Sequence, residues 1–299
     1  MKKTTFKLMG GVGNQLFIYH AAKFYESKSG FPVRFDVTDV SNFRNTHNGD
    51  IRKIINNQNI FISSRALNTY NEIQRKALKF IANENLDRLV KYYNFNEIGY
   101  EPKLLEVPNG SSVHGYFQSY KYVENIDTDL ITNLDKASLN SWITPYLNKV
   151  SKLNILGVHI RRGDYAKLKE EIGILDIKYY IDLIGEITNS VNVDEIWVFS
   201  DEMQHVKANF NQINFKVNVF FIEPPKDSDP LLLLNLMSKP SNLVMANSTF
   251  SWWAAKINSE QIIKNVYSPS KWFRSLADPK YLIPQDWILV DSIWEKVIS

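Results

Sequence analysis

Cysteine is absent from this 299-residue chain, which excludes disulfide bonds, thiolate catalysis and cysteine-ligated metal sites. The five histidines do not occur at metal-ligand spacing, so the sequence gives no indication of a zinc site. There is no apolar run of about eighteen residues, and no signal peptide follows Met1. We therefore expect a soluble, cytoplasmic protein. A peripheral position at the inner face of the membrane is the alternative location.

The composition is that of a folded protein with a sizeable core. Hydrophobic residues make up 44% of the chain and charged residues 22%, and the length suits two domains. The net charge of +3 lacks the dense basic stripe that nucleic-acid binding needs, although it is compatible with an anionic nucleotide. Aromatic residues reach 13%, and their faces suit sugar rings as well as cores. We expect no nucleic-acid partner.

Strands and helices alternate in both halves of the chain. A strand at 4–9, a helix at 14–27 and a strand at 32–37 form a βαβ opening, which predicts a parallel sheet. A cleaner alternation runs through 155–268. Residues 50–100 are polar and rich in asparagine, and we interpret them as helices and loops.

This pattern predicts an α/β fold with two Rossmann-like domains, 1–145 and 146–299, facing a central cleft in which ligands bind. A single extended sheet is the alternative. We expect the aromatic C-terminal tail to pack back on the N-terminal domain.

Two arginines stand directly behind the strand expected at 155–160. Arg161 and Arg162 belong to the segment HIRRGD, which runs from His159 to Asp164. Guanidinium groups pair with phosphate oxygens through two hydrogen bonds, and parallel sheets bind ligands at the carboxyl ends of their strands. The segment therefore predicts a site for a phosphate-bearing donor, held without a metal. The alternative is a surface arginine pair bridged to Asp164.

A polar segment follows the strand expected at 242–246 and opens a helix. It contains Asn247, Ser248, Thr249, Phe250 and Ser251. Hydroxyl groups and backbone amides at a helix start suit an anion, so we predict a phosphate cradle here. An ordinary serine or threonine N-cap is the alternative.

Two acidic segments have open interpretations. Asp201 ends a strand, where its carboxylate suits a guanine edge or ribose hydroxyls, or alternatively caps the next helix. Asp127 and Asp129 imitate the Asp-x-Asp pair that binds a divalent cation in many sugar transferases. Because they stand at a helix start away from the arginines, we interpret them as caps and expect no metal.

A glycine-rich turn follows the first strand and reads Gly10-Gly11-Val12-Gly13-Asn14-Gln15. Leu16 stands where a dinucleotide-binding fingerprint has its third glycine, so we do not expect an NAD site. Gly11 and Gly13 permit close approach of a ligand. Asn14 and Gln15 suit hydrogen bonds to an uncharged polyol across the cleft. We assign these four residues, together with Gln118, to the side of the cleft that would bind such a polyol as the acceptor of a transferred group.

Five segments occur in order: GGVGNQLF from Gly10, GYFQS from Gly115, HIRRGDY from His159, FSD from Phe199 and ANSTFSWW from Ala246. With the trailing SPSKWF they span residues 10 to 273. Together they resemble the α-1,2-fucosyltransferases of glycosyltransferase family 11, in a bacterial, soluble form.

The resemblance implies a GT-B fold, GDP-fucose as donor, inversion at the anomeric carbon, and neither metal nor other cofactor. It also implies that Arg161 contacts the β-phosphate, that His159 lies near the nucleotide, and that residues 248–251 complete the cradle. The implied acceptor is the 2-hydroxyl of a galactose-terminated oligosaccharide, free or lipid-linked, of a surface polysaccharide such as O-antigen.

Our mechanistic hypothesis is a single displacement in which Arg161 stabilises the charge on the departing phosphate. Asp164 is the candidate base, or alternatively orients an arginine through an ion pair. Three other functions stay open: a carbohydrate-binding or scaffold protein without turnover, a fucosyltransferase with another linkage or a protein acceptor, and a metal-dependent transferase using Asp127 and Asp129.

Overall fold

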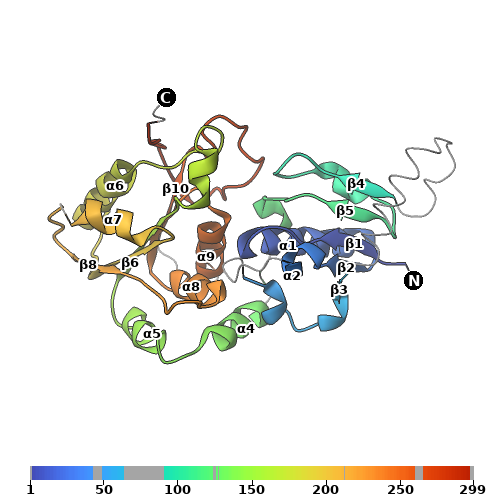
Figure 1. Cartoon of the computed structure of the whole chain (residues 1–299), viewed down its shortest axis with the longest axis horizontal. Coiled ribbons are helices and arrows are strands. Elements are labelled where there is room, and N and C mark those ends of the chain that lie inside the picture. Colours follow the sequence, from blue (N-terminus) through green and yellow to red (C-terminus); the bar gives the residue numbers. More distant parts are fainter. Residues whose placement is uncertain are drawn as a thin grey trace. The chain divides into compact units, whose positions relative to one another are not determined.

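The computed structural model describes residues 2–42, 49–63, 91–123, 126, 128–211, 213–259 and 265–296. The chain divides into two compact units, each with a parallel sheet of its own (Figure 1). Unit 1 comprises Met1–Asn125 and Lys280–Leu282, and unit 2 comprises Ile126–Pro279 and Ile283–Ser299. The α/β class expected from the sequence is confirmed.

Unit 1 contains a sheet with the strand order β3-β2-β1-β5-β4. Its strands are β1 (Thr4–Lys7), β2 (Val33–Asp36), β3 (Phe61–Ile62), β4 (Tyr92–Asn94) and β5 (Ser112–His114). Its described helices are α1 (Val12–Ser29), α2 (Thr38–Asn42) and the short 3-10 turns Ile51–Lys53, Gln58–Ile60, Pro102–Glu106 and Tyr120–Tyr122. The helices and loops that we expected at 50–100 also contain β3 and β4, whereas residues 64–90 lie outside the described part.

A glycine with a positive φ angle, which favours glycine, lies near each end of helix α1. Gly10 has a φ of 68°, and a Cβ there would lie 2.7 Å from Asn14 Nδ2. Gly30 has a φ of 72° at the C-cap, where its amide donates to the Glu26 carbonyl. Between them α1 is buried over most of its surface and contacts β1 and β2, and the Phe6 ring of β1 lies 5.7 Å from the Tyr25 ring of α1. The glycine-rich turn is thereby held at the carboxyl end of β1.

Unit 2 contains a sheet with the strand order β11-β10-β9-β6-β7-β8, again parallel throughout. Its strands are β6 (Ile155–Ile160), β7 (Glu195–Ser200), β8 (Asn218–Phe221), β9 (Asn242–Val244), β10 (Asn265–Pro269) and β11 (Ile288–Val290). Its described helices are α4 (Thr128–Ser138), α5 (Thr144–Val150), α6 (Ile177–Ser190), α7 (Met203–Phe210), α8 (Pro230–Met237), α9 (Thr249–Ser259) and the 3-10 turn Asp164–Leu168. Strand β11 falls in the tail, where we had expected no strand.

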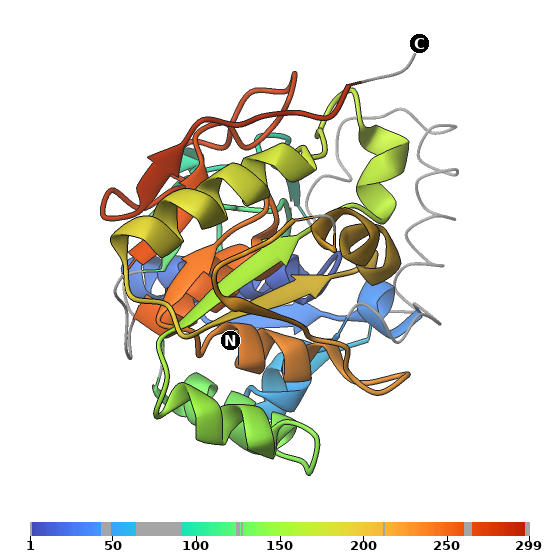
Figure 2. The same ribbon diagram turned by 90° about the vertical axis from the view of Figure 1, so that its left-hand side faces the viewer.

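Helices cover both faces of the unit 2 sheet, and α6 and α8 lie on opposite sides of β6 and β7 (Figure 2). Asp176 caps α6 by accepting from the Lys178 amide, and Asp229 caps α8 ahead of Pro230. All six residues of β6 are buried, as expected for a central parallel strand. Its alternate side chains pack in one cluster with β7 and α6. A rigid β6 fixes the point from which the arginines emerge.

Two connections bear on the domain boundary. Helix α4 packs against α8, and Asn235 Nδ2 donates to Ser138 Oγ, so the chain divides by compactness between Asn125 and Ile126. The boundary near 145 stays a prediction. The chain also returns to unit 1 at Lys280–Leu282, where the Tyr281 carbonyl accepts from Ser119 Oγ and the Tyr120 amide, both at 2.9 Å.

Candidate functional site

Each sheet has one point at which the strand order changes direction, and the polar segments gather there. In unit 2 the chain runs from β6 outward through β7 and β8, then returns to the other side of β6 with β9, β10 and β11. Residues 161–164 follow β6, Asp201 follows β7 and residues 247–251 follow β9. Because the strands are parallel, these segments lie at one edge of the sheet, which is where α/β sheets bind ligands.

Arg161 is held by two carboxylates. Its Nη2 lies 2.6 Å from Asp164 Oδ1, and its Nη1 lies 3.1 Å from Asp201 Oδ2. The guanidinium carbon is 5.5 Å from the ring centre of Tyr165, within the range of a cation–π contact. The side chain is 30% exposed, so a charged ligand can reach it.

Asp201 links the ends of β6 and β7. Its Oδ1 accepts from the backbone amide of Arg162 at 3.0 Å, while Oδ2 contacts Arg161. Gly163 passes so close that a Cβ there would lie 2.5 Å from Asp201 Oδ2. The carboxylate thus anchors the arginines, a role that neither of our interpretations of Asp201 contained. Its contact with guanine or ribose stays a prediction.

Arg162 points to a different set of carboxylates. Its Nη1 pairs with Glu295, and its Nε lies 3.5 Å from Glu202. Glu295 also pairs with Lys169 Nζ at 3.0 Å. Arg162 is 13% exposed, less than half the exposed fraction of Arg161. The two arginines, adjacent in the sequence, therefore occupy different surroundings, and Arg161 is the more exposed of the two.

The segment before α9 is built from internal hydrogen bonds. Ser248 Oγ accepts from the Phe250 amide at 3.3 Å, so Ser248 caps the helix, as in the alternative that we kept open. Ser251 Oγ donates to the Ala246 and Ser248 carbonyls. Asn247 Nδ2 contacts the carbonyls of Ile172, Gly173 and Trp272, and its Oδ1 is buried without a partner among the described residues. Thr249 and Phe250 are partly exposed at the first turn.

Tyr165 bridges the segments that follow β6 and β9. Its hydroxyl donates to the Asn247 carbonyl at 3.0 Å, and burial raises the pKa of Tyr165 to about 12. The tyrosine therefore stays neutral and connects Arg161 with the start of α9. No role was predicted for Tyr165 from the sequence, although it follows Asp164 directly in the segment HIRRGDY.

His159 is a buried, neutral imidazole beneath this site. It is 5% exposed on β6, and its ring centre lies 6.0 Å from that of Phe250. Burial, with a further contribution from Arg161, lowers the pKa of His159 to about 3. Its Nδ1 has no partner among the residues that the structure describes.

Unit 1 has a second polar site, at the point between β1 and β5 where its own strand order changes direction. Gln118 Nε2 donates to Asn14 Oδ1 at 3.0 Å, and Gln118 Oε1 is buried without a described partner. Phe117, just before it, has a φ of 53°, which is strained for a bulky residue. The structure thus brings Asn14 and Gln118 together.

Gln15 has a different position from these two. It is fully buried, its Nε2 donates to the Gly10 and Gly49 carbonyls, and its Oε1 accepts from the Ile51 amide. Gln15 therefore supports the turn, and its contacts do not favour the acceptor role that we predicted. Gly11 is the N-cap of α1 and Gly13 is buried in its first turn.

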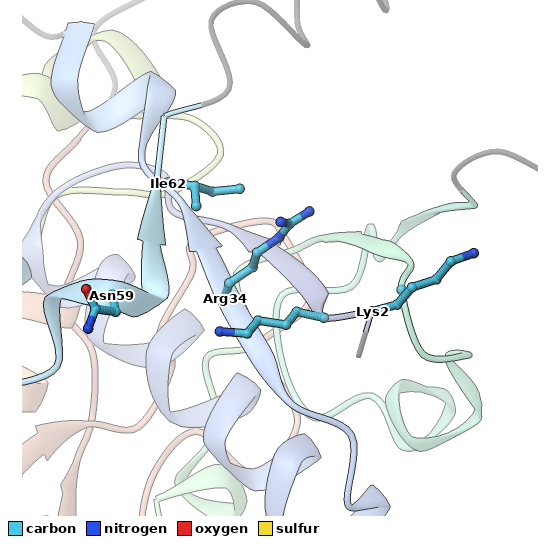
Figure 3. Close-up of a pocket in the computed structure, with 6 residues that line it drawn as sticks. Lys2, Arg34, Asn59 and Ile62 are labelled. Atoms are coloured by element: carbon cyan, nitrogen blue, oxygen red, sulfur yellow. The ribbon is translucent and has the colours of Figure 1, made fainter.

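A cavity of about 440 Å³ in unit 1 is lined by Lys2, Lys3, Arg34, Asn59, Ile62 and Gly110 (Figure 3). Lys2 and Lys3 precede β1, whereas Asn14 and Gln118 follow the carboxyl ends of β1 and β5. This cavity therefore does not belong to the polar site of unit 1.

Asp127 lies outside the described residues, so the interpretation of Asp127 and Asp129 as helix caps stays a prediction. Among the residues that are described, no group of three or more histidine, aspartate or glutamate side chains is arranged to hold a metal ion. None of the described helices is long and apolar enough to cross a membrane.

Residues 8–288 match the family described as Glycosyl transferase family 11. The chain belongs to this family. It is 30% identical to the O-antigen biosynthesis glycosyltransferase WbnK of Escherichia coli, with 94% of this chain and 98% of that one covered. It is 27% identical to an Escherichia coli alpha-1,2-colitosyltransferase, over 95% of this chain and 98% of the relative.

The fold of this family 11 glycosyltransferase is also found in a solved structure. The fucosyltransferase NodZ from Bradyrhizobium matches with a TM-score of 0.50 at 10% identity, covering 89% of this chain and 94% of that one. The likeness concerns the fold alone, and it confirms the GT-B type that the resemblance implied. The recognised family is likewise confirmed.

The low pKa of His159 generates a prediction about acid stability. The unfolded chain protonates this imidazole near 6.5, whereas the folded protein keeps it neutral down to about 3. The unfolded state thus binds more protons in this window, so the free energy of unfolding should fall as pH drops from 6.5 towards 3. Above pH 6.5, His159 should make no contribution to the pH dependence of the free energy of unfolding.

Urea denaturation of His159→Gln across this pH range should show a shallower acid dependence than the wild type. His205→Gln, at an exposed histidine, is the matched control. Burial and Arg162 also lower the pKa of His205, so this variant should reduce the slope as well, but less than His159→Gln does. Titration of the His159 ring by NMR with a midpoint near 6.5 would contradict the assignment.

Proposed function

We propose that this family 11 glycosyltransferase moves L-fucose from GDP-fucose to the 2-hydroxyl of a terminal galactoside on a surface glycan such as O-antigen. The C1–O bond to the diphosphate breaks as the acceptor oxygen bonds to C1 from the opposite face. The acceptor hydroxyl gives its proton to a general base, and GDP leaves. The observation that carries the proposal is Arg161, partly exposed at the carboxyl edge of the sheet, between Asp201 and the first turn of α9.

The surroundings of Arg161 suit a ligand whose negative charge grows during the reaction. Asp201 fixes one side of the guanidinium, so its direction is set before the donor binds. Preorganised donors of this kind stabilise a transition state without reorganisation. Tyr165 connects Arg161 with the segment 247–251. The N-terminus of α9 carries a partial positive charge and would also attract a phosphate group.

Asp164 fits the role of an orienting group better than that of the base. Its carboxylate lies 2.6 Å from Arg161 Nη2, and its side chain is 67% exposed. It would orient Arg161 in the free protein, and an incoming phosphate would then take its place on the guanidinium, because both compete for the same N–H groups. If Asp164 were the base, Asp164→Asn would lose the acidic limb of the pH–rate profile. We expect the limb to persist.

In unit 1, the pair of Asn14 and Gln118 is our candidate for contacts with the acceptor sugar. Both are neutral amides, which suit hydroxyl groups, and the buried Gln118 Oε1 has an acceptor position to spare among described residues. The sugar transferred has a second candidate, colitose, because one relative is named for its transfer. Offering both donor sugars with a panel of galactosides, and determining the linkage by NMR, distinguishes the two.

Arg161→Ala should lower kcat by about 10²- to 10³-fold with GDP-fucose saturating, because one preorganised donor to the leaving group is lost. Arg34→Ala, an arginine of unit 1 outside both polar sites, is the control and should retain wild-type kcat. The measurement is GDP release coupled to transfer. An Arg161→Ala enzyme with most of its rate intact would show that the leaving group is stabilised elsewhere.

We also propose that the reaction needs no metal, since the guanidinium and the helix start supply the positive charge. The transfer rate should then be the same in excess EDTA as in its absence. A rate that falls with EDTA and returns with Mg²⁺ or Mn²⁺ would favour the metal-dependent alternative based on Asp127 and Asp129.

A further inference from the structure

A short C-terminal segment, residues 293–295, lies antiparallel to residues 174–176. The Glu295 amide donates to the Ile174 carbonyl at 2.9 Å, and the Asp176 amide donates to the Ile293 carbonyl at 2.7 Å. Leu175 and Trp294 form the bridge between these two bonds. The segment therefore holds the end of the loop that begins with the arginines.

The two segments approach each other closely at Gly173 and Trp294. Gly173 has a φ of 81°, and a Cβ there would lie 2.6 Å from the Trp294 ring. Arg274 Nη1 donates to the Glu295 carbonyl at 2.6 Å, which fixes the backbone of the segment from the other side. Trp294 also packs against the core cluster of β6, β7 and α6. Glu295 is thus presented from a well-fixed backbone.

The side chain of Glu295 divides its carboxylate between two cations of the loop. One oxygen pairs with Arg162 Nη1 and the other with Lys169 Nζ at 3.0 Å. Glu295 is 17% exposed and Arg162 is 13% exposed, so water screens this pair little. The remaining carboxylate near Arg162, Glu202, is 3.5 Å away and 44% exposed, and is a weaker partner.

We propose that Glu295 is a positioning residue for the donor site, which rests on the proposed function. It holds the Arg162 guanidinium, and with it the Arg162 backbone amide that donates to Asp201, so that the Asp201 carboxylate stays in place for Arg161. Without Glu295, the Arg162 side chain would keep only the longer, more exposed contact with Glu202, and the backbone that positions Asp201 would be held less firmly. Arg162 therefore acts by holding the loop in place, and of the two arginines only Arg161 contacts the β-phosphate.

The test is a double-mutant cycle on GDP affinity, measured by isothermal titration calorimetry with GMP as the second ligand. Glu295→Gln should weaken GDP about tenfold and GMP much less, because the β-phosphate contact through Arg161 is the one disturbed. Arg162→Met should have a similar effect, and the double variant should be no worse than either single one. Glu171→Gln, an exposed carboxylate of the same loop, is the matched control.

Two outcomes would overturn the inference. Arg162→Met could abolish GDP binding while Glu295→Gln leaves it unchanged, which would make Arg162 a phosphate ligand itself. Alternatively, Glu295→Gln could lower the Tm and leave the GDP-to-GMP affinity ratio at the wild-type value, which would reduce Glu295 to a stabilising role. Should Glu295→Gln fold poorly, Glu295→Asp keeps the charge on a shorter side chain and is expected to lie between the two.

Hydrogen exchange separates this inference from the proposed function. The amides of Asp176 and Glu295 should exchange faster in Glu295→Gln than in the wild type, without any nucleotide present. Faster exchange in a protein that binds no GDP would reject the proposed donor and would leave Glu295 only the role of holding the loop. Unchanged exchange together with normal GDP binding would reject the positioning role and leave the donor in place.

Discussion

The arrangement at the edge of the unit 2 sheet depends on the carboxylate of Asp201. One oxygen accepts from the Arg162 backbone and the other pairs with the Arg161 side chain, so the ends of β6 and β7 are joined by a single group. The close passage requires glycine at position 163. A cation held by a fixed carboxylate keeps its direction in the absence of ligand, and this preorganisation is what a departing diphosphate needs.

Both units place polar groups where the strand order of the sheet changes direction, but the groups differ in charge. In each sheet polar groups follow the two strands between which the strand order changes direction, and in unit 2 Asp201 is added from the end of the neighbouring strand β7. In unit 2 these groups are charged and lie beside a helix start, which suits phosphate. In unit 1 the pair of Asn14 and Gln118 is neutral, which suits sugar hydroxyls. These side chains are the basis on which we propose a donor unit and an acceptor unit.

Much of the architecture could be predicted from local patterns. Strand β6 is apolar along nearly its whole length, α6 has a clear apolar periodicity, and aspartates cap α6 and α8. The arginine motif stands at a strand end as expected. β3 has only two residues, and β11 is largely exposed, so neither has a distinctive pattern. Gln15 looked like a ligand contact because its position was right, yet its amide is taken by backbone groups.

The different ion-pair partners of the two arginines could not be predicted from local sequence patterns. Arg162 and Glu295 are separated by 133 positions, and nothing near either residue indicates the other. Adjacent arginines suggest one phosphate clamp, but consecutive side chains after a strand end need not point the same way. Here the fold gives Arg161 to the exposed edge and Arg162 to a nearly buried network.

A crystal structure of the protein with GDP would test the central claim most directly. Our account predicts the β-phosphate within hydrogen-bond distance of Arg161 and beside the first turn of α9, with Asp201 still on Arg161 and Arg162 still on Glu295. A nucleotide bound away from Arg161, or a phosphate held by Arg162 in its place, would contradict it.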